Sequence, residues 1–228
     1  MARAVGYLNS GSRIETMKYK YFLFDWDGSL GNSLPLWFEA FQKVFAEYGK
    51  RVTYKQIGEK VIGDWEGPLR MGIENQEEFF AEMEKELLPK LPDVELNQGA
   101  KELIEKIKKL GGKVAVVSSS KRKYVEPAMM KNGLMNLVDV FLSMEDVKRY
   151  KPDPMMLNRA LGMVGGESGR AIMVGDTGKD IVAAKNAGMD SALYYPKRYE
   201  EYYARRLQEG WKPTYMIRGF AELERFLK

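Results

Sequence analysis

The chain of 228 residues contains no cysteine and no histidine. Without cysteine it can form neither a disulfide nor a nucleophilic thiolate, and we expect a reducing compartment, the cytoplasm, as its location. Without histidine it lacks the side chain that most often serves as a general base and as a ligand of transition metals. Any catalysis must therefore use carboxylates, hydroxyls, lysine, arginine and backbone groups.

The sequence also lacks a cluster of basic residues and a long apolar run. Its 36 Lys and Arg and its 32 Asp and Glu leave a net charge of +4, which is dispersed along the chain rather than gathered as in nucleic-acid-binding proteins. No apolar stretch reaches the length of about 18 residues that a transmembrane helix needs, and the first residues do not resemble a signal peptide. We therefore expect neither a nucleic acid nor a membrane as a partner.

What the sequence does contain is a repeated alternation of helices and strands. Residues 18–24 predict a buried strand, after a loose N-terminal extension at 1–17. Aromatic residues at helical spacing over 34–48 predict a helix, and helical segments continue to about residue 88. Five apolar strands then alternate with helical stretches, and these strands are KVAVVS, VDVFLS, RAIMVGD, DSALYY and PTYMI.

This order predicts an α/β fold, with a Rossmann-like parallel sheet that helices cover on both faces. The remaining helices are expected at 98–110, 122–131, 154–163, 179–187, 199–208 and 219–227. Residues 18–31 and 92–228 are expected to form the α/β core. Residues 32–91 are expected to form a helical domain inserted after the first strand.

Two aspartates, Asp25 and Asp27, follow the first predicted strand in the stretch FLFDWDGS. In open α/β sheets, ligands bind at the carboxyl ends of the strands, where this pair lies. Two carboxylates so close raise each other's pKa unless something compensates their charge, as a bound cation would. An ordinary exposed Asp-Gly turn explains the pair alone equally well.

Hydroxyl and ammonium groups follow other predicted strands. Ser118 ends the strand KVAVVS and is followed by Ser119 and Lys121, so that hydroxyls and backbone N–H groups there could hold a phosphate oxygen. A helix N-cap is the commoner role of such serines. Lys151 lies between a strand and the prolines of KPDP, where it either presents its ammonium to an anion or is an ordinary solvated lysine in a turn.

Two more carboxylates, Asp176 and Asp180, follow the strand RAIMV in the stretch GDTGKD. They would repel a phosphate by themselves, whereas carboxylate oxygens are ligands that Mg²⁺ prefers.

Taken together and in this order, the motifs DWDGS, VVSSS, KPDP and GDTGKD resemble the four motifs of the haloacid dehalogenase (HAD) superfamily. The resemblance extends from about Lys18 to the end of the chain. The helical insertion directly after the first motif is similar to the C1-type cap of members that resemble phosphoglycolate phosphatase or β-phosphoglucomutase.

The resemblance implies a Mg²⁺-dependent phosphatase that hydrolyses a small phosphorylated metabolite through an aspartyl-phosphate intermediate. It implies that Asp25 is the nucleophile and that Asp27 is the general acid and base. It also implies that Mg²⁺ is bound by Asp25, the backbone carbonyl of Asp27 and Asp176, with Asp180 contributing directly or through water.

By the same resemblance, Ser118 and Lys151 would hold the oxygens of the transferring phosphoryl group, with Ser119 and Lys121 as further contacts. In the inserted domain, Trp65 and Arg70 are candidate substrate contacts. Packing of Trp65 between helices and solvation of Arg70 are the alternative interpretations.

Other activities remain open at this point. Dehalogenases lack the second aspartate, so Asp27 favours phosphoester hydrolysis or transfer. β-Phosphoglucomutases carry a histidine at the start of the cap, where this chain aligns Trp37; this disfavours a phosphosugar mutase without excluding it. A non-catalytic member that binds metal and phosphate is a further alternative, and we expect a monomer or a homodimer.

Overall fold

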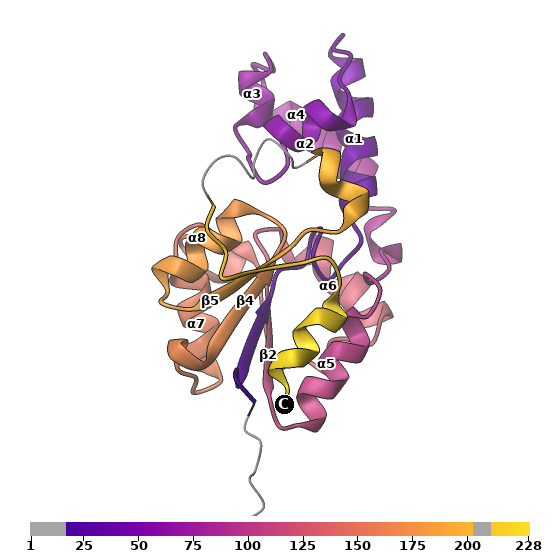
Figure 1. Cartoon of the computed structure of the whole chain (residues 1–228). Coiled ribbons are helices and arrows are strands. Elements are labelled where there is room, and N and C mark those ends of the chain that lie inside the picture. The colour runs from indigo at the N-terminus through magenta and orange to yellow at the C-terminus, as the bar shows by residue number, and fades with distance from the viewer. Residues whose placement is uncertain (1–16, 203–210) are drawn as a thin grey trace, which may run out of the picture.

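The computed structural model describes residues 17–202 and 211–228, and within them the chain forms a six-stranded sheet of order β3-β2-β1-β4-β5-β6 (Figure 1). Every pairing in this sheet is parallel. The strands are β1 (Tyr21–Phe24), β2 (Lys113–Val117), β3 (Val140–Leu142), β4 (Ala171–Gly175), β5 (Asp190–Tyr194) and β6 (Tyr215–Ile217). The predicted α/β fold is confirmed. The N-terminal extension lies outside the described residues except for Met17, and so does most of the helix expected at 199–208.

Helices cover both faces of the sheet. Successive residues of a strand point to opposite faces, and in this sheet both faces carry apolar side chains that the helices bury. In β1, Phe22 and Phe24 pack into one hydrophobic cluster, while Leu23 packs into a second cluster on the other face. The first cluster includes residues of α5 (Ala100–Lys109), α6 (Arg122–Lys131) and η5 (Phe220–Phe226). The second includes residues of α7 (Met155–Met163) and α8 (Gly178–Asn186).

Residues 32–91, which follow β1, contain four α-helices. These are α1 (Leu34–Glu47), α2 (Tyr54–Lys60), α3 (Gly67–Arg70) and α4 (Gln76–Leu87). Figure 1 shows these helices grouped beyond the end of the sheet at which the strands finish. Phe41, Phe45 and Phe79 join α1 to α4 through ring contacts. We refer to this group as the cap helices.

The last predicted helix, 219–227, differs from expectation, because the chain forms the 3₁₀ helix η5 there instead of an α-helix. Its buried residues Phe220, Leu223 and Phe226 recur every third position. This spacing places all three on one face of a 3₁₀ helix, which has three residues per turn. The remaining short 3₁₀ helices are η1 (Leu91–Asp93), η2 (Met144–Asp146), η3 (Ser168–Arg170) and η4 (Lys197–Tyr199). Every helix within 17–202 and 211–228 is too short or too polar to span a bilayer.

The order of the strands places a crevice beside β1. The chain proceeds from β1 to β2 and β3 on one side and then returns to β4 on the other side of β1. Phe24 is aligned with Val116 of β2 and with Val174 of β4, so these three strands end at nearly the same level. Such a reversal of strand order is where open α/β sheets bind ligands.

Candidate active site

A buried ammonium joins two buried carboxylates at this edge of the sheet. Asp25 directly follows β1, and its backbone N–H donates to the carbonyl oxygen of Val174 at 2.9 Å. Lys151 Nζ lies 2.6 Å from Asp25 Oδ1, 2.6 Å from Asp180 Oδ1 and 3.0 Å from the carbonyl oxygen of Val117. The side chains of Lys151, Asp25 and Asp180 are only 3%, 10% and 1% exposed. The lysine predicted from KPDP therefore contacts the aspartate predicted as nucleophile.

Burial changes the protonation equilibria of this cluster. Burial raises the pKa of Asp25 to about 7; Lys151 opposes this rise, whereas Asp180 and Asp27 add to it. Burial disfavours the charged form of Lys151, but the carboxylates of Asp180 and Asp25 outweigh that effect and raise the pKa of the lysine. Asp25 therefore lies in surroundings that a further positive charge would stabilise.

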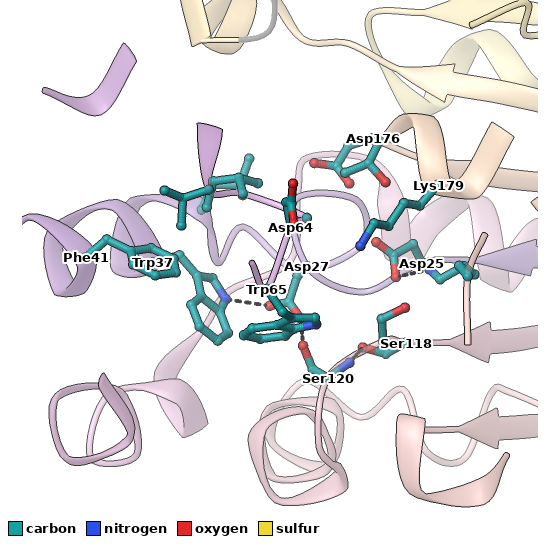
Figure 2. Close-up of a pocket in the computed structure, with 17 residues that line it drawn as sticks. Asp25, Asp27, Trp37, Phe41, Asp64, Trp65, Ser118, Ser120, Asp176 and Lys179 are labelled. Carbon is teal, nitrogen blue, oxygen red and sulfur yellow. Dashed lines mark hydrogen bonds and ion pairs between the residues drawn. The ribbon is translucent and has the colours of Figure 1, made fainter. Parts of the chain in front are cut away.

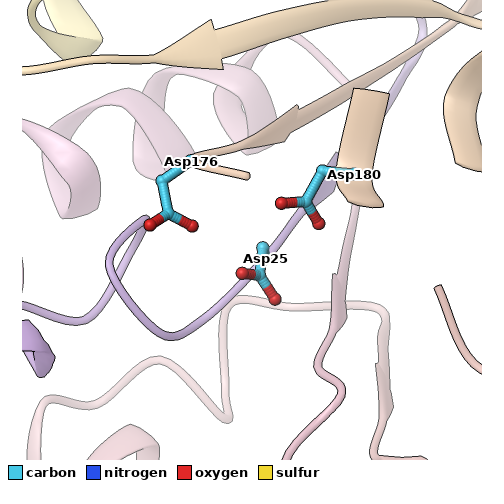
Figure 3. A group of neighbouring side chains, drawn as sticks. All are labelled: Asp25, Asp176 and Asp180. Carbon is cyan, nitrogen blue, oxygen red and sulfur yellow. The ribbon is translucent and has the colours of Figure 1, made fainter. Parts of the chain in front are cut away.

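The third buried carboxylate of the cluster is that of Asp176, which directly follows β4. One oxygen each of Asp25, Asp176 and Asp180 can be chosen so that all three lie within 4.8 Å of one another. Figure 3 shows the three side chains around a common space: Asp25 follows β1, Asp176 follows β4, and Asp180 lies at the start of α8. This group of oxygen ligands without nitrogen or sulfur fits Mg²⁺.

The two oxygens of Asp180 already accept hydrogen bonds from protein groups. Oδ1 accepts from Lys151, and Oδ2 accepts from the backbone N–H and the hydroxyl of Thr177 at 3.0 and 2.7 Å. Thr177 is the N-cap residue of α8, so Asp180 is held by a capping box at the start of this helix.

A glycine brings the loop after β1 against Asp176. Gly28 has a φ of +75°, and a Cβ atom at this position would lie 2.3 Å from Asp176 Oδ2. Any larger residue would therefore need both a left-handed backbone and a displaced Asp176 carboxylate.

Asp27 has different surroundings from Asp25. Its Oδ1 accepts a hydrogen bond from the Ser33 hydroxyl at 2.7 Å. Figure 2 shows two further donors: Trp37 Nε1 donates to Oδ1 at 2.9 Å, and the Ser120 hydroxyl donates to Oδ2 at 2.6 Å. These donors fix the orientation of the carboxylate. The sequence analysis did not predict these three hydrogen-bond donors, because the sequence around each of them does not indicate that it contacts Asp27.

The serines predicted to contact phosphate follow β2 at the same edge of the sheet. Ser118 Oγ accepts a hydrogen bond from the backbone N–H of Ser120 at 3.1 Å. Ser119 Oγ is buried and has no hydrogen-bond partner among the described residues. Both serines line the same cavity as Asp25 and Lys151.

This cavity, which we call the active-site cavity, has a volume of about 100 Å³. It is lined on one side by the strand ends and on the other by residues from α1 to Trp65. A second cavity of about 690 Å³, the outer cavity, shares Trp37 and Trp65 with it.

The structure does not bring two of the predicted contacts to the active-site cavity. Arg70 forms ion pairs with Asp64 and, at 3.4 Å, with Glu66, and does not line this cavity. Lys121 forms an ion pair with Glu84 of α4 at 3.1 Å and lines the outer cavity. Contacts of these two cations with a substrate stay predictions, whereas Trp65 does line the active-site cavity.

The chain is similar to known proteins over most of its length. A family model described as haloacid dehalogenase-like hydrolase matches residues 22–194. The pyrophosphatase PpaX of Halalkalibacterium halodurans is 30% identical over 216 residues, which cover 91% of this chain and 96% of that protein. The validoxylamine A 7'-phosphate phosphatase of Streptomyces hygroscopicus subsp. limoneus is 32% identical over 182 residues, which cover 75% of this chain and 83% of that protein.

A solved structure shares the fold. The structure of a HAD family hydrolase from Deinococcus radiodurans R1, with bound phosphate and sodium, superposes with a TM-score of 0.75 at 22% identity. The match covers 91% of this chain and 94% of that one.

Proposed function

The chain belongs to the haloacid dehalogenase-like hydrolase family, and we propose that it is a Mg²⁺-dependent phosphatase that hydrolyses a small phosphomonoester through an aspartyl-phosphate intermediate. The observation that carries the proposal is the buried cluster in which Lys151 binds Asp25 and Asp180 beside Asp176. The names of two relatives, the pyrophosphatase PpaX and the validoxylamine A 7'-phosphate phosphatase, also support it.

Asp25 would be the nucleophile. Lys151 holds one oxygen of its carboxylate and offsets its charge, so the carboxylate is oriented before a substrate arrives. Attack of a carboxylate oxygen on phosphorus forms an acyl phosphate, and the bond between phosphorus and the leaving-group oxygen breaks. Hydrolysis of the acyl phosphate by water releases inorganic phosphate and regenerates the carboxylate.

Asp27 would move the protons in both steps. In its protonated form it donates a proton to the leaving-group oxygen, and as a carboxylate it then accepts a proton from the attacking water. The three hydrogen bonds from Ser33, Trp37 and Ser120 keep its carboxyl group in one orientation for this role.

The phosphoryl oxygens would be held by the hydroxyls of Ser118 and Ser119 and by the backbone N–H of Ser119, and the charge of Lys151, which lines the same cavity, would attract them. The backbone N–H of Ser118 already donates to the carbonyl oxygen of Leu142. Asp25, Asp176 and the backbone carbonyl of Asp27 would hold Mg²⁺, and Asp180 would contribute directly or through water. The ion supplies positive charge that lets a phosphate approach these carboxylates.

Phosphate release from a panel of small phosphoesters, with MgCl₂ and with EDTA, tests the proposal. We expect release that needs Mg²⁺ and that falls by about 10⁴-fold or more in Asp25→Asn, since the nucleophile is lost. The control is Asp93→Asn, an identical change at a carboxylate that is 72% exposed and paired with Lys131.

Full activity of Asp25→Asn would contradict the mechanism. Conversion of a sugar 1-phosphate into the 6-phosphate without release of phosphate would identify a mutase instead.

A further inference from the structure

The active-site cavity has two chemically different sides. One side, formed by the strand ends, the turn at Lys151 and the start of α8, contributes carboxylates, serines and the lysines Lys151 and Lys179. The opposite side is almost entirely apolar and consists of Leu34, Trp37, Phe41, Val61, Ile62 and Trp65. In Figure 2, Phe41 and Trp37 lie on the side opposite to Asp176, Lys179 and Asp25. A phosphoryl group that reaches Asp25 would therefore direct the rest of its ester toward the aromatic side.

Among residues 17–202 and 211–228, no positively charged side chain belongs to the apolar side of this cavity. Its one ionisable lining residue is Asp64, whose carboxylate is paired with Arg70. Arg70 also pairs with Glu66, so this group of two carboxylates and one guanidinium has a net negative charge. A leaving group that carried a carboxylate or a second phosphate would lose its hydration against the side chains of the apolar side, whereas the lysines of the cavity belong to its opposite side.

The aromatic side chains form a preorganised surface. Trp37 donates its indole N–H to Asp27, which leaves only its apolar ring surface for a ligand. The rings of Trp37 and Trp65 meet edge to face, with centroids 6.3 Å apart, and Trp65 meets Phe80 in the same way at 5.3 Å. Contacts on both rings hold them in place, so a ligand that packs against them need not order them first.

The outer cavity adjoins the active-site cavity at Trp37 and Trp65 and is the larger of the two. Its volume of about 690 Å³ lies within the usual range for ligand sites, roughly 300–1,000 Å³. Besides Trp37 and Trp65, its lining includes Phe80, Leu88 and the ring of Tyr124. The two lysines in its lining, Lys85 and Lys121, are already paired with Glu82 and Glu84.

We propose that the leaving group of the substrate is an uncharged and largely apolar alcohol that packs against Trp37 and Trp65. Aromatic and branched aliphatic phosphomonoesters belong to this class, whereas pyrophosphate and carboxylated phosphoesters do not. The inference deepens the proposed function and rests on it for the position of the phosphoryl group.

Equilibrium binding tests this inference without depending on turnover. Calorimetry with MgCl₂ compares benzylphosphonate with 4-carboxybenzylphosphonate, two non-hydrolysable ligands that differ only in one carboxylate. We expect benzylphosphonate to bind about 100-fold more tightly, because a buried group left without its partner costs affinity of this order. Equal affinity, tighter binding of the carboxylated ligand, or no binding of either would overturn the inference.

A pair of variants tests whether Trp65 contacts the leaving group. Trp65→Lys places an ammonium on the apolar side, and we expect it to reduce the 100-fold preference to less than about tenfold, since the carboxylate gains a partner. Trp65→Leu keeps the surface uncharged and should retain the preference for benzylphosphonate. If both variants keep the wild-type ratio, the leaving group does not lie against Trp65, and the inference fails.

The two proposals can fail separately. A wild-type protein that binds benzylphosphonate selectively but releases no phosphate from benzyl phosphate would refute the phosphatase while supporting the apolar site. Hydrolysis that is faster for 4-carboxybenzyl phosphate than for benzyl phosphate would support the phosphatase and overturn the apolar leaving group.

Discussion

Replacement of Lys151 by methionine removes the ammonium that compensates two buried carboxylates. Methionine retains an unbranched side chain of similar length, so Lys151→Met changes charge and hydrogen bonding more than volume. Asp25 and Asp180 each lose a partner at 2.6 Å, and the carbonyl of Val117 loses a donor at 3.0 Å. Because all three side chains of the ion-pair cluster are nearly inaccessible, water cannot replace the ammonium without a local rearrangement.

The structure sets the size of the expected effect. Removal of one partner from a buried ion pair costs about 3–5 kcal/mol, because the other charge stays buried and uncompensated. Lys151 serves two carboxylates, so we expect the free energy of unfolding without Mg²⁺ to fall by about 4–5 kcal/mol at neutral pH. This is a large part of the total of about 5–15 kcal/mol that is typical of a folded protein.

Urea unfolding in EDTA and in MgCl₂ measures this loss. Lys179→Met is the matched control, because Lys179 lines the same cavity but is only partly buried, and it should lose less than about 1 kcal/mol. If a divalent cation binds the carboxylates, MgCl₂ should stabilise Lys151→Met more than it stabilises the wild type. Adding Asp180→Asn to Lys151→Met should recover part of the loss in EDTA, since one of the uncompensated charges is removed.

Two results would refute the reasoning. A loss below about 1 kcal/mol in Lys151→Met, no larger than in Lys179→Met, would show that the carboxylates do not depend on the ammonium. An identical loss with and without MgCl₂ would show that no divalent cation compensates these carboxylates.

Three further changes test other contacts. Trp37→Phe removes one donor to Asp27, and we expect kcat for phosphate release to fall about tenfold; an unchanged kcat would show that this hydrogen bond does not support catalysis. Lys123, Tyr124 and Lys121, around the start of α6, lower the pKa of Glu84 from 4.5 to about 2. The carboxylate of Glu84 therefore stabilises the fold above about pH 4.5, and this stabilisation is lost as the pH falls toward 2. Glu84→Gln should therefore lower the free energy of unfolding by about 1 kcal/mol at pH 7 and less at pH 3, and an equal loss in urea unfolding at both values would contradict the ion pairing. Gly28→Ala should cost about 2 kcal/mol or more, because its Cβ would lie 2.3 Å from a buried carboxylate oxygen. Gly49→Ala is its control, since Gly49 has a φ of +70° and nothing within 4 Å of an added Cβ, and equal losses in the two variants would show that the carboxylate yields freely.

The sequence predicts those site residues whose positions follow from the order of the strands in the sheet. Asp25, Ser118 and Asp176 each come directly after a strand. Because β2, β1 and β4 are adjacent and parallel, their carboxyl ends meet, and these residues lie together. The alternation of helices and strands therefore determines which residues share the edge of the sheet, and the confirmed fold follows from the same pattern.

Contacts that depend on how separate elements pack could not be predicted in this way. Lys121 has a local sequence that suits a phosphate contact, yet it is paired with Glu84, which precedes it by 37 positions. Arg70 likewise is paired with Asp64 within its own segment. A sequence pattern shows which side chains a helix presents, whereas the partner of an exposed cation depends on which carboxylate the neighbouring element brings within reach.

Asp25 and Asp27, the two aspartates of DWDGS, differ in the side chains that surround their carboxylates, and this difference suits them to different chemical roles. Asp25 lies in a buried cluster with Asp180 and the ammonium of Lys151, where burial raises its pKa to about 7. Asp27 instead accepts three hydrogen bonds from uncharged donors of the loop after β1, the cap helix α1 and the loop after β2. Carboxylates that differ in this way can divide a reaction between them, one bonding to the substrate and the other moving protons. Because one donor to Asp27 is Trp37, whose ring also lines the apolar side of the cavity, the residue that would recognise the leaving group also positions the group that would protonate it.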